Sequence, residues 1–285
     1  MPNDRTLLED ARNLFAAVLS RVSGRHVPAI ERAFRAIRRE DFFPNGPWLT
    51  FTAAGYVPTP AADAILLQQN LLFAIDAEKG INNGEPSLHA AWLAAVRPKP
   101  GEHALHVGCG NGFYSAVIAN LVDRHGSVTA FEIEPEIAAS ARRYLASFPQ
   151  VAVQTASAAG AILPSSDLIY VNASSCEPLA NWVDALRPNG RLVFPWQAAS
   201  DLGVSVMITR TATGFSASVL GRALFIPLKI DARPSTPHLR RDAVRKISSL
   251  VRSRDRAPDE TSVAVFDQLW FSTDKLPNAG EDARG

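Results

Sequence analysis

The residues best suited to chemistry follow two apolar segments near the middle of the chain. Leu105-His106-Val107 leads into Gly108-Cys109-Gly110-Asn111-Gly112, and a second apolar run ends in Glu132 about twenty residues later. Glycines let a backbone approach a ligand closely, and an acid at the end of a second strand can accept hydrogen bonds from ribose hydroxyls. This order predicts the nucleoside-binding half of a doubly wound sheet.

The spacing of the glycines separates two classes of nucleotide ligand. A dinucleotide fingerprint reads G-x-G-x-x-G, with its third glycine at the contact between helix and sheet. Here the third glycine is Gly112, one residue early, and Phe113 stands at the dinucleotide position. G-x-G-x-G after a strand is expected for S-adenosylmethionine (SAM), which has no pyrophosphate to place on a helix N-terminus. The spacing therefore predicts a methyltransferase and disfavours a nicotinamide-dependent oxidoreductase.

Composition and charge are compatible with a cytoplasmic protein. The 285 residues carry a formal net charge of +1, which gives no overall attraction to nucleic acid or acidic membranes. Cys109 and Cys176 cannot build a disulfide framework and suit a reducing compartment. No apolar run approaches the ~18 residues of a membrane span, and charged residues interrupt the N-terminus. We expect no nucleic-acid or membrane partner, and the sequence does not indicate the oligomeric state.

Strand and helix patterns alternate regularly after His103. The strand-like segments are 104–107, 127–132, 151–154, 167–172, 191–194, 203–209 and 215–220. The helical patterns between them are 113–123, 135–146 and 178–186. Such alternation predicts an α/β fold, a doubly wound, mostly parallel seven-stranded sheet that is Rossmann-like and closes with an antiparallel hairpin.

Two further segments flank this predicted core of residues 101–222. Residues 1–100 contain four helical patterns, the third from about Ala61 to Ala77 and the fourth ending near Arg97. An irregular connection lies at 44–60, and a polar loop precedes the fourth helix. Residues 223–285 contain a basic segment at 240–256, predicted to be a helix with a solvated face, and a tail predicted to be disordered. We therefore predict three domains: an N-terminal covering part, the SAM-binding core and a C-terminal extension.

The carboxyl ends of the predicted strands supply the candidate cofactor site. We expect Glu132 to bind the ribose, the third strand to end near the adenine and the fourth near the methyl group. His103 and His106 lack an acid or cysteine at metal-ligand spacing, so no metal site is predicted. The candidate cofactor-binding residues are Gly108, Cys109, Gly110, Asn111, Gly112, Tyr114, Glu132, Ile133, Ala156, Ser157 and Asn172.

The loop before the sheet is rich in polar side chains and is the candidate substrate site. Its candidate substrate residues are Asn82, Asn83, Gly84, Ser87 and His89. The candidate catalytic residues are Asn83, Glu85 and Asn172, although a tight turn explains Asn82 and Asn83 equally well. A carboxylate acceptor is already ionised at neutral pH and needs no base, whereas a hydroxyl or amine does. Because the chain offers no unambiguous base, the sequence favours a carboxylate acceptor on a peptide, protein or small molecule.

Several of these segments together resemble protein-L-isoaspartate O-methyltransferases. The resemblance covers roughly residues 28–197 and is carried by Ala33–Pro44, the loop before the sheet, His106–Gly112, Glu132–Glu136 and Leu186–Leu192. It implies a SAM-dependent carboxyl methyltransferase fold, with substrate held between that loop and the fourth strand.

Two departures from the family pattern keep other functions open. The family carries Ile-Ser-x-Pro in the loop, with the serine as its candidate active-site hydroxyl, whereas this chain has Asn83-Gly84-Glu85-Pro86. Thr155-Ala156-Ser157 stands where Gly-Asp-Gly is usual, which removes a carboxylate near the adenine. We therefore expect a divergent SAM-dependent O-methyltransferase. True isoaspartyl repair and a SAM-binding module without catalysis are the alternatives.

Overall fold

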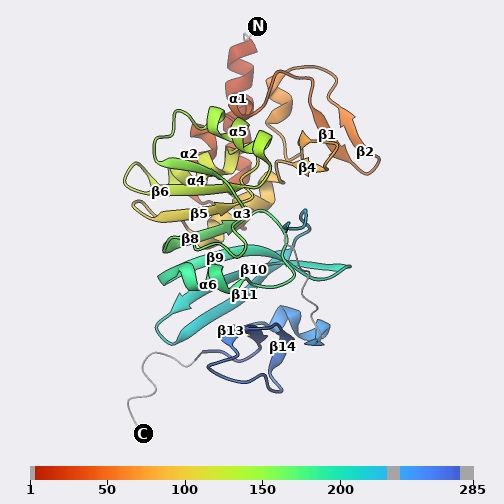
Figure 1. Ribbon diagram of the computed structural model, residues 1–285. Helices are drawn as coiled ribbons and strands as arrows, with labels where there is room; N and C mark the ends of the chain where they lie inside the picture. Colours follow the sequence, from red (N-terminus) through yellow and green to blue (C-terminus); the bar gives the residue numbers. More distant parts are fainter. Residues whose placement is uncertain (1–3, 230–237, 277–285) are drawn as a thin grey trace. The chain divides into compact units, whose positions relative to one another are not determined.

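The computed structural model describes residues 4–229 and 238–276 of the chain (Figure 1). The chain divides into two compact units, Met1–Ala156 and Ser157–Gly285. The boundaries expected at residues 100 and 222 fall inside these units. None of the described helices combines the length and the apolar character that a membrane crossing requires.

The first unit contains a parallel three-stranded arrangement in the order β5–β6–β7. Its parallel strands are β5 (His103–Val107), β6 (Ser127–Glu132) and β7 (Val151–Thr155). Its α-helices are α1 (Asp4–Leu19), α2 (Pro28–Ala36), α3 (Pro86–Val96), α4 (Phe113–Val122) and α5 (Pro135–Tyr144). The expected strand–helix alternation is confirmed here, and proline begins three of these helices, where its fixed φ and missing N–H cost nothing.

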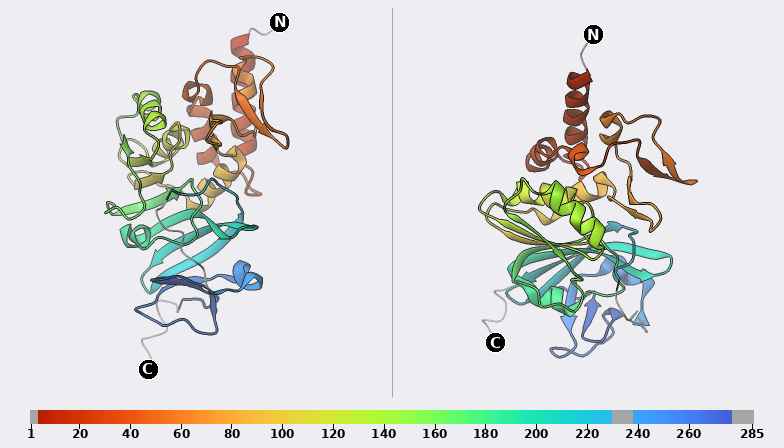
Figure 2. Two further views of the ribbon diagram at one scale, coloured as in Figure 1. Left: turned by 45° about the vertical axis from the view of Figure 1, so that its right-hand side comes forward. Right: turned by 45° about the horizontal axis from the view of Figure 1, so that its top comes forward.

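Two hairpins and two short 3₁₀ helices stand where the sequence predicted other structure. The elements are η1 (Arg39–Phe42), β1 (Leu49–Thr52), β2 (Gly55–Pro58), η2 (Ala64–Leu67), β3 (Ala74–Asp76) and β4 (Ile81–Asn82). The connection predicted to be irregular at 44–60 thus contains the β1–β2 hairpin, which projects from the rest of its unit (Figure 2). The predicted helix Ala61–Ala77 is wrong, because the segment holds only one short helix and then a strand.

A buried arginine explains why that helix does not form. Arg39 is 1% exposed, and its guanidinium donates to the carbonyl oxygens of Leu67, Gln69 and Leu71 at 2.6, 2.8 and 2.9 Å. The carbonyls of every second residue thus point toward one planar cation. A helical backbone could not place them in this way, so the segment is irregular. Burial lowers the pKa of Arg39 to about 10, so the side chain stays charged at neutral pH.

The second unit is built on a sheet that is mostly antiparallel (Figure 2). Its strands, in spatial order, are β8 (Ser166–Val171), β9 (Leu186–Ala199), β10 (Leu202–Thr211), β11 (Gly214–Arg222), β13 (Ser249–Arg252), β15 (Leu269–Ser272), β14 (Ser262–Val265) and β12 (His238–Leu239). The β8–β9 pair is parallel, and the remaining pairs in this order are antiparallel. Two-residue turns link β9 to β10 and β10 to β11, and such short turns join antiparallel strands only. The expectation of a mostly parallel sheet therefore does not hold in this unit.

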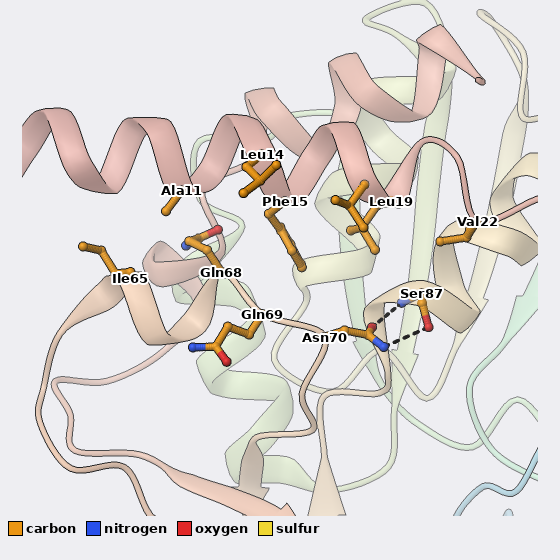
Figure 3. Close-up of a pocket in the computed structure, with 11 residues that line it drawn as sticks. Ala11, Leu14, Phe15, Leu19, Val22, Ile65, Gln68, Gln69, Asn70 and Ser87 are labelled. Carbon is orange, nitrogen blue, oxygen red and sulfur yellow. Dashed lines mark hydrogen bonds between the residues drawn. The ribbon is translucent and has the colours of Figure 1, made fainter. Parts of the chain in front are cut away.

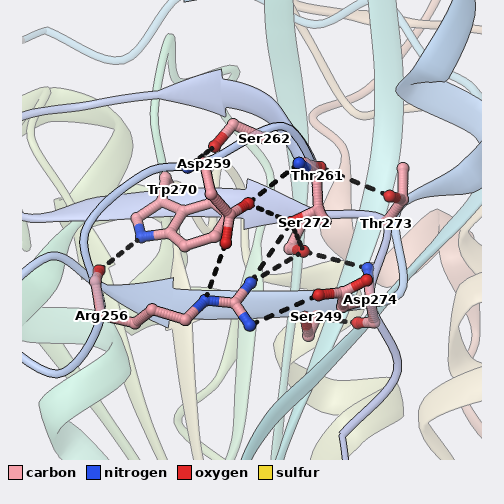
Figure 4. A network of polar contacts seen from close by, with 9 residues as sticks. All are labelled: Ser249, Arg256, Asp259, Thr261, Ser262, Trp270, Ser272, Thr273 and Asp274. Atoms are coloured by element: carbon pink, nitrogen blue, oxygen red, sulfur yellow. Dashed lines mark hydrogen bonds and ion pairs between the residues drawn. The ribbon is translucent and has the colours of Figure 1, made fainter.

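The basic segment 240–256 is a second correction. Instead of one amphipathic α-helix it forms the 3₁₀ helix η3 (Arg241–Lys246) followed by β13. Among the described residues, the α-helix of this unit is α6 (Ala180–Ala185). Arg256 lies 4.7 Å from the Trp270 ring and 3.4 Å from carboxylate oxygens of Asp259 and Asp274 (Figure 4). Part of the segment pairs as a strand, and Arg256 forms ion pairs. The basic side chains therefore do not line one solvated face of a helix. The predicted disordered tail, from Pro277 onward, lies outside the described residues.

We expect Arg39→Met to lower the free energy of unfolding by about 3 kcal/mol, because three carbonyls lose a charged donor inside the core. Arg39→Lys should restore only part of this loss, since an ammonium group cannot reproduce the planar fork. Urea denaturation followed by circular dichroism measures both variants. The control is Arg35→Met, which removes a half-exposed guanidinium from α2. Equal stability of the Arg39 and Arg35 methionine variants would contradict the role assigned to Arg39.

Candidate active site

The glycine turn after β5 adopts a conformation that only glycine tolerates well. Gly108, Gly110 and Gly112 have φ angles of 71°, 55° and 91°. A Cβ atom at Gly110 would lie 2.9 Å from Cδ1 of Ile75, and one at Gly112 would lie 2.7 Å from Cδ1 of Leu145. Left-handed backbone and close neighbours therefore both require glycine at these two positions. The turn is packed from both sides by the first unit.

Glu132 reaches this turn from the end of β6. Glu132 is buried, with 7% of the residue exposed. One carboxylate oxygen accepts from the Gly110 N–H at 2.9 Å, and the other accepts from the Glu134 N–H at 3.0 Å. A carboxylate offers about four acceptor lone pairs, so both oxygens keep capacity for further donors. The acid and the glycine turn that the sequence analysis paired are thus in direct contact.

The β3–β4 hairpin lies against the same region and was not anticipated. Lys79 Nζ is 2.7 Å from Oε2 of Glu134 and 3.4 Å from Oδ2 of Asp76, and these carboxylates raise the pKa of Lys79. Ile75, on the same hairpin, approaches Gly110. The hairpin is therefore fixed at one point by an ion pair and at another by an apolar contact. Ile133, next to the acid, is 41% exposed and offers an apolar surface beside the carboxylate.

Three residues predicted to bind the cofactor are buried, and two of them make hydrogen bonds within the fold. Asn111 is 4% exposed, and its Nδ2 donates to the Phe42 carbonyl at 2.7 Å, which ties the turn to η1. Tyr114 is buried on α4, and its hydroxyl donates to the Gly84 carbonyl at 3.3 Å. Burial raises the pKa of Tyr114 and that of the Cys109 thiol, so both groups stay protonated at neutral pH. These contacts fix the shape of the turn, and the predicted roles of the three residues in cofactor binding stay predictions.

The asparagines of the loop before α3 build its turn. Asn82 Oδ1 accepts from the Gly84 N–H at 3.0 Å, and Asn83 Oδ1 accepts from the Phe73 N–H at 2.9 Å. Asn83 is only 6% exposed, yet its Nδ2 has no hydrogen-bond partner among the residues that the structure describes. A buried donor without a partner is costly and is a candidate contact for a ligand. Turn formation and ligand contact are therefore compatible at Asn83.

Glu85 and Ser87 form an exposed cluster with Asn70. Asn70 Nδ2 donates to Glu85 Oε1 at 2.9 Å and to Ser87 Oγ at 3.1 Å (Figure 3), and the Ser87 hydroxyl donates to the same carboxylate oxygen at 2.5 Å. Glu85 is exposed, unlike a general base that is buried in an active site.

The His89 ring occupies the space that a side chain at position 84 would need. Gly84 has a φ of 75°, and a Cβ atom there would lie 2.2 Å from Nε2 of His89. The His89 ring is fully buried and stacks on Tyr114 at 3.7 Å between ring centroids. Burial lowers the pKa of His89 well below its usual value, so the ring is neutral at physiological pH. The serine of the family pattern is therefore sterically impossible here while His89 keeps this position.

The remaining predicted residues divide between the two units. The Ala156 N–H donates to the backbone carbonyl of Glu132 at 3.1 Å, at the end of the first unit. Ser157 and Asn172 belong to the second unit, where Asn172 directly follows β8. Their predicted roles stay predictions. His106 is buried and its Nδ1 lies 2.7 Å from the Ser115 hydroxyl, and the described residues hold no group of three or more potential metal ligands.

Comparison with known proteins agrees with this arrangement. The sequence model of the protein-L-isoaspartate(D-aspartate) O-methyltransferase family matches residues 21–232. The chain belongs to this family. The resemblance inferred from the helix exit, the loop and the glycine turn is thereby confirmed. The described residues 238–276, with β12 to β15, lie beyond the matched region.

Curated relatives named protein-L-isoaspartate O-methyltransferase match different shares of the chain. The Aeropyrum pernix protein is 34% identical over 134 residues, which cover 45% of this chain and 51% of the relative. The Methanopyrus kandleri protein is 30% identical over 130 residues, covering 42% and 58%. The Brucella anthropi protein is 26% identical over 208 residues, covering 72% and 87%. The chain thus spans little more than half the length of the Aeropyrum and Methanopyrus relatives.

Solved structures show the fold. A protein-L-isoaspartate O-methyltransferase superposes with a TM-score of 0.65 at 20% identity, covering 77% of this chain and 66% of that chain. A Plasmodium falciparum protein, solved in complex with S-adenosyl-L-homocysteine, gives a TM-score of 0.61 at 17% identity, covering 76% and 98%. The expected Rossmann-like methyltransferase fold is confirmed at this level.

We expect Gly84→Ser to lower the free energy of unfolding by about 3 kcal/mol. About 1–2 kcal/mol comes from the left-handed backbone, and the remainder comes from displacing His89. Gly80→Ser is the matched control, because Gly80 has a φ of 67° but no atom within 4 Å of a Cβ placed there. In a His89→Ala background, Gly84→Ser should lower the free energy of unfolding only by the part due to the left-handed backbone. Urea denaturation of the double-mutant cycle measures this coupling, and strict additivity would show that His89 is not the obstacle.

Proposed function

We propose that the chain is a SAM-dependent carboxyl O-methyltransferase that acts on a carboxylate of a peptide, a protein or a small molecule. The observation that carries the proposal is the 2.9 Å hydrogen bond from the Gly110 N–H to Glu132. It joins a glycine turn with the spacing expected for SAM to the acid expected to bind ribose. Family membership supports the same activity.

The described residues fit the cofactor. SAM supplies, when bound, a methyl group on a sulfonium centre that an acceptor oxygen takes in one in-line displacement. Glu132 would accept hydrogen bonds from the ribose hydroxyls with the lone pairs that its two backbone donors leave open. The exposed side chain of Ile133 would cover one face of the adenine. Gly108–Gly112 would hold the amino-acid end, and Ala156, Ser157 and Asn172 would border the remaining parts.

Asn83 is the best-supported contact for the acceptor. Its buried Nδ2 is a neutral donor without a partner among the described residues, and a carboxylate oxygen would satisfy it. Positioning by such a donor suits an acceptor that is already ionised and needs no proton removed. Burial lowers the pKa of His89 and raises that of Tyr114, which makes the imidazole a weak base and keeps the phenol protonated, so neither suits proton removal from a hydroxyl acceptor. Glu85 and Asn172 stay in the proposal as groups that orient the acceptor.

Repair of isoaspartyl residues is the second candidate. The family and the named relatives favour it. Gly84, in the place of the family serine, and the polar turn Thr155-Ala156-Ser157 favour a different carboxylate. The absence of a disulfide framework continues to support a cytoplasmic location for either activity.

We expect Glu132→Ala to weaken SAM binding by about a hundredfold, because a buried acceptor of ribose hydroxyls is worth about 1.5–3 kcal/mol. Glu136→Ala removes an exposed acid from α5 and should leave the affinity unchanged. Isothermal titration with SAM and with S-adenosylhomocysteine measures both variants. No binding by the folded wild-type chain would refute the proposed cofactor.

We expect Asn83→Asp to raise the KM for the acceptor at least about tenfold while leaving SAM affinity unchanged. The aspartate keeps the acceptor for the Phe73 N–H but replaces the neutral donor with a negative charge that repels a carboxylate. Asn45→Asp is the control, since it makes the same chemical change at an exposed asparagine outside this loop and should leave the KM unchanged. The assay follows S-adenosylhomocysteine release with an isoaspartyl peptide and with its aspartyl counterpart. Fast turnover of the isoaspartyl peptide alone would favour repair, and no product with any carboxylate would favour the binding-module alternative.

A further inference from the structure

The segment that follows β8 in the second unit, residues 172–177, is held between two other segments of that unit. We call it the β8 loop. The Ser174 N–H donates to the Ile226 carbonyl at 2.9 Å, and the Ser175 N–H donates to the Pro195 carbonyl of β9 at 2.9 Å. Both serines are buried. The first residue of the loop is the asparagine that the proposed function assigns to the methyl acceptor, so the position of the loop bears on that role.

Trp196, on β9, fixes the far end of the β8 loop through its indole. The Trp196 Nε1 donates to the Cys176 carbonyl at 2.9 Å, and the residue is fully buried. A buried indole N–H needs a hydrogen-bond partner, and here the partner belongs to the loop. The position of the Cys176 carbonyl therefore depends on the position of the indole ring.

The strands β14 and β15 supply the packing that holds this ring. The ring centroids of Phe266 and Phe271 lie 6.0 and 5.0 Å from that of Trp196, and 5.7 Å from one another. Phe266 directly follows β14, and Phe271 lies on β15. Both phenylalanines lie beyond the region that the family model matches, whereas Trp196 lies within it. Trp196 therefore connects strands outside the matched region to the β8 loop.

The turn between β14 and β15 approaches the β8 loop at a second point. Burial raises the pKa of Glu177, and the negative charge of Asp267 raises it further. Glu177 follows Cys176 in the loop, and Asp267 follows Phe266 in the turn. Two successive residues of the loop are thus influenced by two successive residues of the turn, one pair through the indole and the other through charge.

We propose that Trp196 is a positioning residue for the methyl acceptor: it holds the β8 loop in the place that β14 and β15 set for the indole. This inference rests on the proposed function, because it takes the loop to border the acceptor. In this role Trp196 contacts neither cofactor nor acceptor and acts through the loop. A displaced wall of the site weakens binding of the acceptor without altering the reacting groups, so the KM for the acceptor is the property that Trp196 controls.

Trp196→Phe tests the indole N–H, because phenylalanine keeps an aromatic ring against the two phenylalanines and removes the donor. We expect the KM for the acceptor to rise about tenfold, while kcat and SAM affinity change less than about twofold. The assay uses an isoaspartyl peptide or its aspartyl counterpart, whichever the wild type methylates.

Trp270→Phe is the matched control. Trp270 is equally buried, and its Nε1 donates at 3.1 Å to the carbonyl of Arg256, which lies outside the β8 loop. Urea denaturation should show a similar loss of stability in both variants, because each loses one buried N–H donor. Only Trp196→Phe should raise the KM. An equal rise in both variants would mean that general loss of stability is the cause and would overturn the proposal.

Phe271→Leu tests whether β15 acts through the indole. Alone, this variant should raise the KM about threefold, since a smaller side chain supports the Trp196 ring less well. In the Trp196→Phe background it should raise the KM no further. Strictly additive effects in this double-mutant cycle would show that the strands do not act through Trp196.

Hydrogen–deuterium exchange gives a readout that does not depend on activity. Trp196→Phe should speed exchange of the backbone amides of residues 174–177 at least about tenfold, and Trp270→Phe should leave it unchanged. Unchanged exchange in Trp196→Phe would overturn the proposal. If the wild type binds SAM but methylates neither peptide, the proposed function fails and the role toward the acceptor fails with it. Faster exchange in Trp196→Phe would then still establish that Trp196 holds the loop.

Discussion

The buried guanidinium of Arg39 is the interaction on which the first unit depends. It draws the carbonyls of three residues from 67–71 into the core, and the rings of Phe15, Phe73 and Phe113 surround it at 5.2–5.9 Å. Phe113 is the first residue of α4, directly after the glycine turn. One buried cation therefore sets the position of the chain before the sheet and of the helix that begins at the turn.

The polar loop before α3, which carries Asn82 and Asn83, is positioned by residues that contact the same core. Phe73, which packs on Arg39, donates its N–H to Asn83, and Tyr114 on α4 donates its hydroxyl to the Gly84 carbonyl. The loop is thus held from both sides by residues that themselves contact the core around Arg39. This explains how a short polar loop keeps a buried asparagine in place, because the conformational entropy of its turn is offset by fixed hydrogen-bond partners.

The regular parts of the fold were predictable, because local signals and tertiary packing agree there. Parallel strands that are buried on both faces consist of continuous apolar runs in the sequence. The strands β5 and β6 coincide with the apolar runs predicted to be strands. The spacing assigned Glu132 and the glycine turn to one site, and the structure adds the hydrogen bond that joins them. The segment from Ala61 to Ala77 was mispredicted because its apolar residues have helical periodicity, while its backbone is held by a cation distant in sequence.

The same reason limited the prediction of site residues. Nothing near Asn111 or Tyr114 in the sequence indicates that their polar groups are taken by backbone carbonyls of Phe42 and Gly84. Lys79 was missed because its partner, Glu134, is far away along the chain. In the basic stretch, charge composition suggested a solvated helix, yet strand pairing decided its backbone conformation. Local composition indicates which conformations and partners are possible for a segment. Contacts with residues distant in sequence determine which of them the segment adopts.

The close approach of Gly84 and His89 restricts which side chains the two positions can carry together. A serine at position 84 requires the His89 imidazole to move or to be replaced. The side chains allowed at the two positions therefore depend on one another. Relatives that share the histidine should share the glycine, and those with the serine should carry a smaller or differently placed side chain five positions downstream.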